Sequence, residues 1–145
     1  MGLTVALDTN IFINVKNREE PYYRYSRRVL EAVDDGDVKA LVSVIVVAEM
    51  CTGYYMFGDI EGEEEFLAYV LTSPNYEIAD VDAKTADLAG KIRAEAGVRL
   101  PDAILIASAV LRNAYAVVTH DEELRKAEKL VRIMTAREFI ASLGL

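Results

Sequence analysis

The stretch LTVALD, residues 3–8, indicates the fold class, because a short apolar run with a β-branched residue ends there in a carboxylate. Four further runs of similar length follow along the chain: KALVSV (39–44), NYEIAD (75–80), AYAVVTHD (114–121) and LVRIMT (130–135). Each run is long enough for a strand and too short for a helix. The sequence therefore predicts five strands.

Longer amphipathic patterns separate these runs. They predict helices over residues 21–35, 44–57, 61–72, 82–96, 101–113 and 136–143. Strands that alternate with helices are joined by right-handed crossovers and form a mostly parallel sheet with helices on both faces. The expected fold class is α/β, a three-layer α/β/α sandwich, and a single domain is expected over residues 1–145.

Composition limits the classes of function. The chain has 24 acidic and 16 basic residues and a formal net charge of -8, which argues against a large basic face for nucleic acid. One cysteine and one histidine exclude an internal disulfide and a Cys/His metal site. The sequence shows neither a secretory leader nor an apolar run of about 18 residues, so we expect a cytoplasmic protein without a membrane segment.

Four carboxylates stand at informative positions. Asp8 and Asp121 end two of the predicted strands, and the ligand crevice of such sheets lies outside the carboxyl ends of the strands. Glu49 stands inside the apolar stretch VSVIVVAEMC, and Asp102 follows Pro101 in LPDAILIAS. Each acid alone also fits a simpler role, because aspartate caps helices and acids suit the first helical turn.

Together the four acids predict a cation site. The predicted sheet brings them to one crevice, and their motifs contain no paired lysine or arginine. Two carboxylates 4 Å apart repel by about 4 kcal/mol at an effective dielectric constant of 20. Such a group is stable when some acids are protonated or when a divalent cation binds, and oxygen ligands suit Mg²⁺ or Mn²⁺.

The motifs ALDTNIFI, LPDAILIASA and VVTHDEEL, together with the isolated Glu49, resemble those of the PIN-domain ribonuclease family, and most closely its VapC-type toxins. The resemblance covers essentially the whole chain in order and spacing. It implies that Asp8, Glu49, Asp102 and Asp121 form an acidic pocket for Mg²⁺ or Mn²⁺. It also implies that Thr119 orients a carboxylate or a water molecule.

The resemblance further implies a reaction and partners. The reaction is metal-dependent hydrolysis of phosphodiester bonds in single-stranded RNA, with 5′-phosphate and 3′-hydroxyl products. The implied biology is that of the toxin in a type II toxin-antitoxin pair, with a homodimer and a cognate antitoxin protein as assemblies. Thr9 and Asn10 match the DTN motif and would support the end of the first strand, although helix capping explains them equally well.

Other residues receive weaker assignments. The aromatic stretch TGYYMF (52–57) and the nearby YYRY (22–25) indicate an interface or ordinary packing. Two basic groups could follow a phosphate backbone or be solvated, namely Arg24, Arg27 and Arg28, and Lys16 with Arg18. Three residues near the site motifs are given no catalytic role: His120 should point away from Asp121, Cys51 should be a core residue, and Glu123 a solvated helix-start residue.

Three alternatives remain open at this level. The first is a PIN nuclease of RNA processing rather than a toxin, which the sequence does not distinguish. A phosphatase or phosphoacceptor of the haloacid-dehalogenase or receiver type also places an aspartate after the first strand, but the former expects a second aspartate where this chain has Asn10. A non-catalytic PIN-like binding module is the third alternative.

Overall fold

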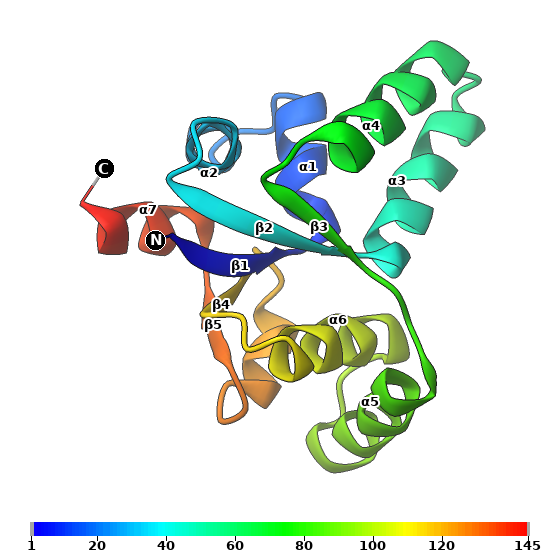
Figure 1. Ribbon diagram of the computed structural model, residues 1–145, viewed down its shortest axis with the longest axis vertical. Coiled ribbons are helices and arrows are strands. Elements are labelled where there is room, and N and C mark those ends of the chain that lie inside the picture. Colours follow the sequence, from blue (N-terminus) through cyan, green and yellow to red (C-terminus); the bar gives the residue numbers. More distant parts are fainter. Residues whose placement is uncertain (1, 145) are drawn as a thin grey trace.

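The computed structural model describes residues 2–144, in which a central sheet separates two layers of helices (Figure 1). The sheet has the strand order β3-β2-β1-β4-β5, and every neighbouring pair is parallel. The predicted three-layer α/β/α fold is confirmed, with a sheet that is parallel throughout. The strands are β1 (Leu3–Leu7), β2 (Val38–Ser43), β3 (Tyr76–Ala79), β4 (Ala116–Val118) and β5 (Arg132–Met134).

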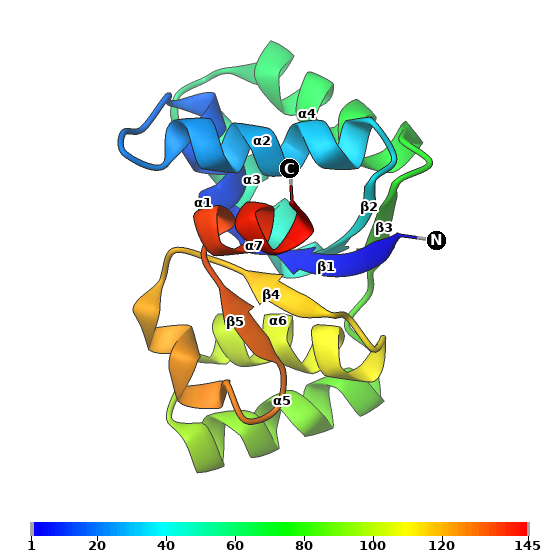
Figure 2. The ribbon, with the colours of Figure 1, turned by 90° about the vertical axis from the view of Figure 1, so that its left-hand side faces the viewer.

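Seven α-helices and one 3₁₀ helix connect and cover these strands within residues 2–144. Helices α5 and α6 cover one face of the sheet, and the other α-helices lie on the opposite side (Figures 1 and 2). The elements are α1 (Thr9–Lys16), α2 (Tyr23–Asp34), α3 (Val44–Met56), α4 (Ile60–Thr72), α5 (Ala83–Ala96), α6 (Leu100–Leu111), η1 (Glu122–Ala127) and α7 (Ala136–Leu143).

The core forms around β1, the middle strand of the sheet. Val5, Ala6 and Leu7 are completely buried, as expected for a parallel strand with helices on both faces. Helix α6 is apolar almost all round, and Ala103, Ile106 and most of their neighbours in it are buried. Such a helix stays fixed against the sheet, and its N-terminus lies at the edge where β1 ends.

Two helices were missed from the sequence. Helix α1 begins at Thr9, where the Asp8 carboxylate caps it by accepting a hydrogen bond from the Thr9 amide, and η1 begins after Asp121, which accepts from the Glu123 amide. The run 114–121 was also predicted too long, because β4 ends at Val118. The polar residues counted as strand ends are cap residues that turn the backbone out of the sheet.

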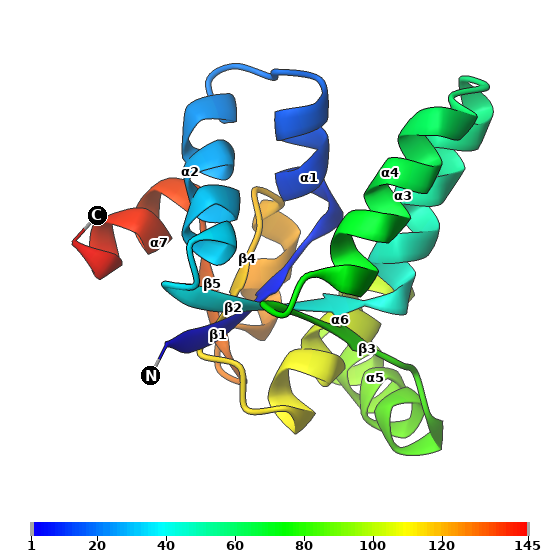
Figure 3. The same cartoon turned by 45° about the horizontal axis from the view of Figure 1, so that its top comes forward.

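Helices α3 and α4 form a hairpin that projects from the body of the molecule (Figure 3). Its tip exposes large apolar side chains: Tyr55 at 57%, Met56 at 80%, Phe57 at 85% and Ile60 at 48%. Among the described residues, every helix is too short or too polar to cross a bilayer. The tip is therefore an apolar surface that the rest of the described chain leaves uncovered.

Candidate active site

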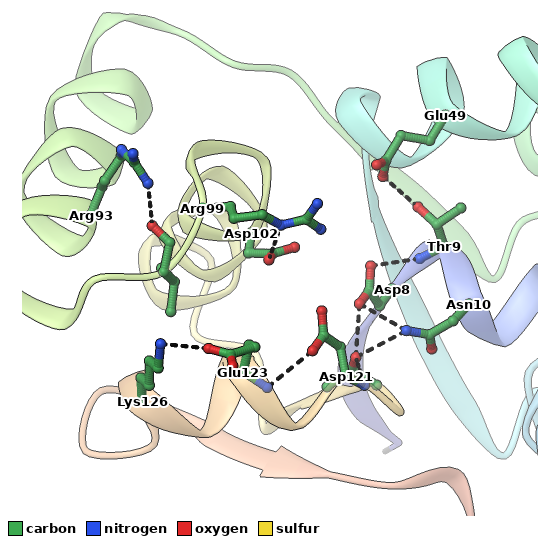
Figure 4. Close-up of polar contacts among 12 residues, drawn as sticks. Asp8, Thr9, Asn10, Glu49, Arg93, Arg99, Asp102, Asp121, Glu123 and Lys126 are labelled. Carbon is green, nitrogen blue, oxygen red and sulfur yellow. Dashed lines mark hydrogen bonds and ion pairs between the residues drawn. The ribbon is translucent and has the colours of Figure 1, made fainter.

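The structure brings the four predicted acids to one edge of the sheet (Figure 4). Asp8 follows β1 and Asp121 follows β4, which are parallel neighbours, so both acids leave the sheet on the same side. Asp102 lies in the first turn of α6, and Glu49 lies in α3. We call Asp8, Glu49, Asp102 and Asp121 the acidic edge.

Asp8 is the most constrained of these acids. It is 7% exposed, and both carboxylate oxygens accept hydrogen bonds. Oδ1 accepts from the Thr9 amide at 2.7 Å, and Oδ2 accepts from the Thr119 hydroxyl at 2.7 Å and the Asn10 side-chain amide at 3.1 Å. Asp8 thus has a fixed orientation toward the space in front of β1 and β4.

Thr119 and Asn10 join the ends of these two strands. The Thr119 hydroxyl donates to Asp8 and accepts from the Asp121 amide at 3.0 Å, so one side chain contacts both aspartates. Asn10 donates to the Thr119 hydroxyl at 3.2 Å and accepts from the His120 amide at 3.1 Å. The predicted orienting role of Thr119 agrees with these contacts, and Asn10 supports the strand ends as its motif suggested.

Thr9 connects the first strand to Glu49. Its hydroxyl donates to the Glu49 carboxylate at 2.6 Å, while its amide donates to the Asp8 carboxylate, which caps α1. Glu49 stands in an apolar stretch of the sequence, but its side chain lies on an exposed face of α3. The neighbouring apolar residues of α3 point to other sides of the helix, where Val46 and Met50 are buried.

Arg99 corrects a second expectation. The acids were predicted to lack a basic partner, but the Arg99 guanidinium lies 3.4 Å from the Asp102 carboxylate, as Figure 4 shows. Gly97, at a φ of 76°, ends α5, and Arg93 donates to the Val98 carbonyl oxygen at 2.9 Å, so a short fixed loop carries Arg99 to the start of α6. The spacing of three residues between Arg99 and Asp102 was the signal in the sequence.

Burial and mutual repulsion perturb the acidic edge. Loss of solvation raises the pKa of Asp8 to about 6, and the negative charges of Asp102 and Glu49 add to this, against the opposing effect of its hydrogen bonds. Burial also raises the pKa of Asp102, although the Arg99 guanidinium acts in the opposite direction. Perturbed carboxylates that face one space are typical of functional sites.

The donor set of the acidic edge suits a hard divalent cation. All four residues offer carboxylate oxygens, the ligands that Mg²⁺ and Mn²⁺ prefer, and bound positive charge would relieve the repulsion that raises the pKa of Asp8. Within residues 2–144, no three Asp, Glu, His or Cys side chains already stand close enough together to hold an ion. The residues therefore fit the chemistry of a metal site without forming a closed ligand cage.

The remaining predicted residues lie outside this edge. His120 points toward α1 and α7, away from Asp121, and Glu123 pairs with Lys126 at the start of η1. Cys51 is only partly buried, so its prediction as a core residue is wrong; α3 exposes one side where it enters the hairpin. Lys16 lies 4.0 Å from the centre of the Tyr54 ring.

Comparison with known proteins agrees with this arrangement. The family model described as PIN domain matches residues 5–130, which is most of the chain. The chain belongs to the PIN domain family. The predicted resemblance is thereby confirmed at the level of the family, and the match includes all four residues of the acidic edge. A search of curated protein sequences gave no match.

Solved structures resemble this PIN domain along nearly its whole length. VapC20 of Mycobacterium tuberculosis, described as a sarcin-ricin loop cleaving toxin, has a TM-score of 0.72 at 15% identity and covers 90% of this chain and 98% of its own. A toxin-antitoxin complex from Klebsiella pneumoniae has a TM-score of 0.69 at 21% identity. The match covers 91% of this chain and 97% of the chain in that structure. FitAcB of Neisseria gonorrhoeae has a TM-score of 0.69 at 21% identity. The match covers 92% of this chain and 98% of the chain in that structure. These likenesses show a shared fold.

Proposed function

We propose that this PIN domain is a Mg²⁺- or Mn²⁺-dependent endoribonuclease that hydrolyses phosphodiester bonds in single-stranded RNA. The observation that carries the proposal is the acidic edge, where Asp8, Glu49, Asp102 and Asp121 face one space; Thr9, Asn10 and Thr119 hold the Asp8 carboxylate, and Thr9 also holds that of Glu49. Family membership supports nuclease chemistry, and the similar fold of a protein described as a loop-cleaving toxin supports RNA as the substrate.

The four acids would hold the metal, and the metal would supply positive charge at the scissile phosphate and acidify a water molecule. Asp8 offers a carboxylate whose orientation Thr119, Asn10 and the Thr9 amide fix. Thr119 sets Asp8 and Asp121 relative to each other. Thr9 directs Glu49 toward the same space, and Arg99 lies where it can bind a phosphate oxygen of the substrate.

The residue at position 10 argues against the phosphatase alternative. Position 10, where a haloacid-dehalogenase phosphatase expects a second acid, holds Asn10, which supports Asp8 and Thr119.

Cleavage of labelled single-stranded RNA, with duplex DNA as the comparison, tests the proposal in Mg²⁺, Mn²⁺ and EDTA. We expect RNA cleavage that requires metal and leaves 5′-phosphate ends. Asp8→Asn and Asp121→Asn should each lower the rate by roughly 100-fold or more, since the metal supplies several kcal/mol of charge stabilisation. Equal cleavage by both variants and the unsubstituted protein would contradict the proposal.

Asp82→Asn is a matched control. Asp82 also follows a strand and caps a helix, accepting from the Thr85 amide at 2.8 Å, but it lies at the start of α5 and outside the acidic edge. This variant should keep full cleavage. A loss of activity here equal to that of Asp8→Asn would mean that general damage to helix caps, and not a metal site, explains the effect.

We further propose that the chain is the toxin of a type II pair, with a homodimer and an antitoxin protein as partners. A groove of about 490 Å³ between α1, α3 and α4, with Phe12, Met50 and Phe66 in its wall, and the exposed hairpin tip offer apolar surface for both. Light scattering at micromolar concentration should give a dimer, and a monomer would contradict that part. The absence of a short neighbouring antitoxin reading frame would favour RNA processing.

A further inference from the structure

A second pocket, of about 210 Å³, opens beside the acidic edge at the carboxyl ends of β4 and β5. His120 contributes to it from the residue before Asp121, and Thr135 contributes from the end of β5. We call it the aromatic pocket. Its lining consists of Pro21, Tyr22, Tyr25, His120, Thr135 and Arg137.

Two stacked rings form one wall of the aromatic pocket. The Tyr22 and His120 rings lie 4.5 Å apart at an interplanar angle of 23°, and Tyr22 remains 43% exposed. His120 Nε2 accepts from the Ala136 amide at 3.2 Å, so Nδ1 carries the proton and donates to Asn14 Oδ1 at 2.8 Å. Both ring nitrogens are thus engaged, and the stack is a fixed, uncharged surface.

Two guanidinium groups flank the third ring. Arg24 lies 4.9 Å and Arg137 5.5 Å from the centre of the Tyr25 ring, and Arg24 also donates to the Tyr25 hydroxyl at 2.8 Å. Neither arginine forms a salt bridge with any described residue, whereas Arg27 and Arg28 both pair with Glu31. Arg137, which lines the aromatic pocket, and Arg24, which contacts the Tyr25 ring, therefore carry positive charge without an ion pair among the described residues, in a chain with a net charge of -8.

This combination matches one ligand chemistry. Single-stranded nucleic acids bind where bases stack on aromatic side chains and cationic groups follow the phosphates. The aromatic pocket and the acidic edge both lie at the carboxyl end of β4, where the Asn10 side chain donates to the Asp8 carboxylate and accepts from the amide of His120, the residue before Asp121.

We propose that the aromatic pocket binds a nucleobase of single-stranded RNA, stacked on Tyr22, with a neighbouring phosphate held by Arg137 and Arg24. The inference rests on the proposed function and adds a substrate subsite to it. The base is recognised by its flat face, so the subsite favours unpaired over duplex RNA and takes any of the four bases.

The test is an RNA-binding measurement in which no cleavage occurs. Asp8→Asn protein serves as the parent, and fluorescence anisotropy measures its affinity for a labelled single-stranded RNA of about 12 nucleotides, within the usual site size. Adding Tyr22→Ala should weaken binding about 5- to 100-fold, the range for loss of one stacked base. Tyr22→Phe, which keeps the ring, should retain the affinity of the parent.

Arg137 has a matched control in Arg132, which lies at the opposite edge of the sheet. Arg132 lies 4.4 Å from the centre of the Tyr115 ring, so it repeats the chemistry of Arg137 and Tyr25 away from the proposed subsite. Arg137→Gln should weaken binding and reduce its salt dependence by about one phosphate contact. Arg132→Gln should change neither quantity, and thermal melting of each variant checks that it is folded.

A crosslink locates the base independently. RNA carrying 4-thiouridine should crosslink to Tyr22 or Tyr25 in the parent. Folded Tyr22→Ala and Arg137→Gln proteins that bind RNA as tightly as the parent, or crosslinks confined to other surfaces, would overturn the subsite. Because binding is measured without cleavage, a ring-dependent affinity in a chain that never cleaves RNA would overturn the proposed nuclease activity and leave the subsite standing.

Discussion

The acidic edge and the aromatic pocket both lie at the carboxyl end of β4, but they differ in how their charged and polar groups are partnered. In the acidic edge, four carboxylates lie around one space, burial and, to a smaller extent, repulsion raise the pKa of Asp8 to about 6, and Arg99 provides positive charge. In the aromatic pocket, uncharged hydrogen bonds fix His120, and two arginines lack an ion-paired partner among the described residues. In the acidic edge the ionised form of Asp8 is disfavoured. In the aromatic pocket both ring nitrogens of His120 already have hydrogen-bond partners.

The difference separates two tasks within a small chain. Charge that repels itself is suited to holding a cation, and such a region gains stability only when the cation binds. Flat rings in fixed positions are suited to binding a base without rearrangement. The net charge of -8 therefore describes neither region by itself, because acidic and basic side chains are distributed over different surfaces.

The largest predicted effect is the dependence of stability on pH that Asp8 of the acidic edge causes. Asp8 has a pKa of about 6 in the folded chain against 3.8 as the ordinary value, so the folded state binds the proton more tightly. Its contribution to the free energy of unfolding is then present at low pH and is lost as the pH rises from about 4 to 6, by about 3 kcal/mol in total. In EDTA, Asp8→Asn should therefore gain stability relative to the unsubstituted protein over that range.

Urea unfolding at several pH values measures this difference, and Asp82→Asn supplies a control of opposite sign. Hydrogen bonds from Thr85 lower the pKa of Asp82, so its stabilising effect is lost as the pH falls, and its variant should lose stability relative to the unsubstituted protein as the pH rises. Parallel pH profiles for Asp8→Asn and the unsubstituted protein would show that the acidic edge is not strained.

A smaller effect on stability is predicted for Asn14, which holds His120 of the aromatic pocket. Asn14 is 4% exposed, accepts from the Ser26 hydroxyl and His120 Nδ1, and donates to Glu19. Asn14→Ala should lower the free energy of unfolding by roughly 2 kcal/mol, because buried partners lose their hydrogen bonds. The loss should be the same with and without Mg²⁺, since Asn14 lies outside the acidic edge.

Thermal and urea unfolding at neutral pH measure the loss, with Asn17→Ala as the control. Asn17 is exposed at the end of α1, so its removal should change stability by no more than about 0.5 kcal/mol. A loss in Asn14→Ala that Mg²⁺ reverses would mean that the two regions are coupled and not separate.

The sequence predicted the parts of the molecule that depend on periodicity. Strand runs and helix patterns led to the α/β sandwich, and the polar ends of LTVALD and AYAVVTHD led to Asp8 and Asp121. Contacts between distant segments were not predictable in this way. The bond from Thr9 to Glu49 spans 40 positions, and the stack of Tyr22 on His120 joins the start of α2 to the end of β4. Neither leaves a periodic signal.

Local signals also failed where one residue has two roles. Asp8 and Asp121 cap helices and belong to the acidic edge, so counting them as strand residues hid α1 and η1. The apolar neighbours of Glu49 in the sequence do not decide its environment, because a helix turns adjacent residues to different sides. Arg99 was overlooked because the motif around Asp102 was considered without the preceding turn.

The position of β1 at the centre of the sheet has a consequence for synthesis on the ribosome. Its partner β4 and the residues Thr119 and Asp121 are made more than 100 positions later, and Thr119 fixes Asp8. A nascent chain that has emerged only as far as α6 lacks both the strand and the hydrogen bonds that complete the acidic edge. The acidic edge is therefore completed only after the chain through Asp121 has left the ribosome.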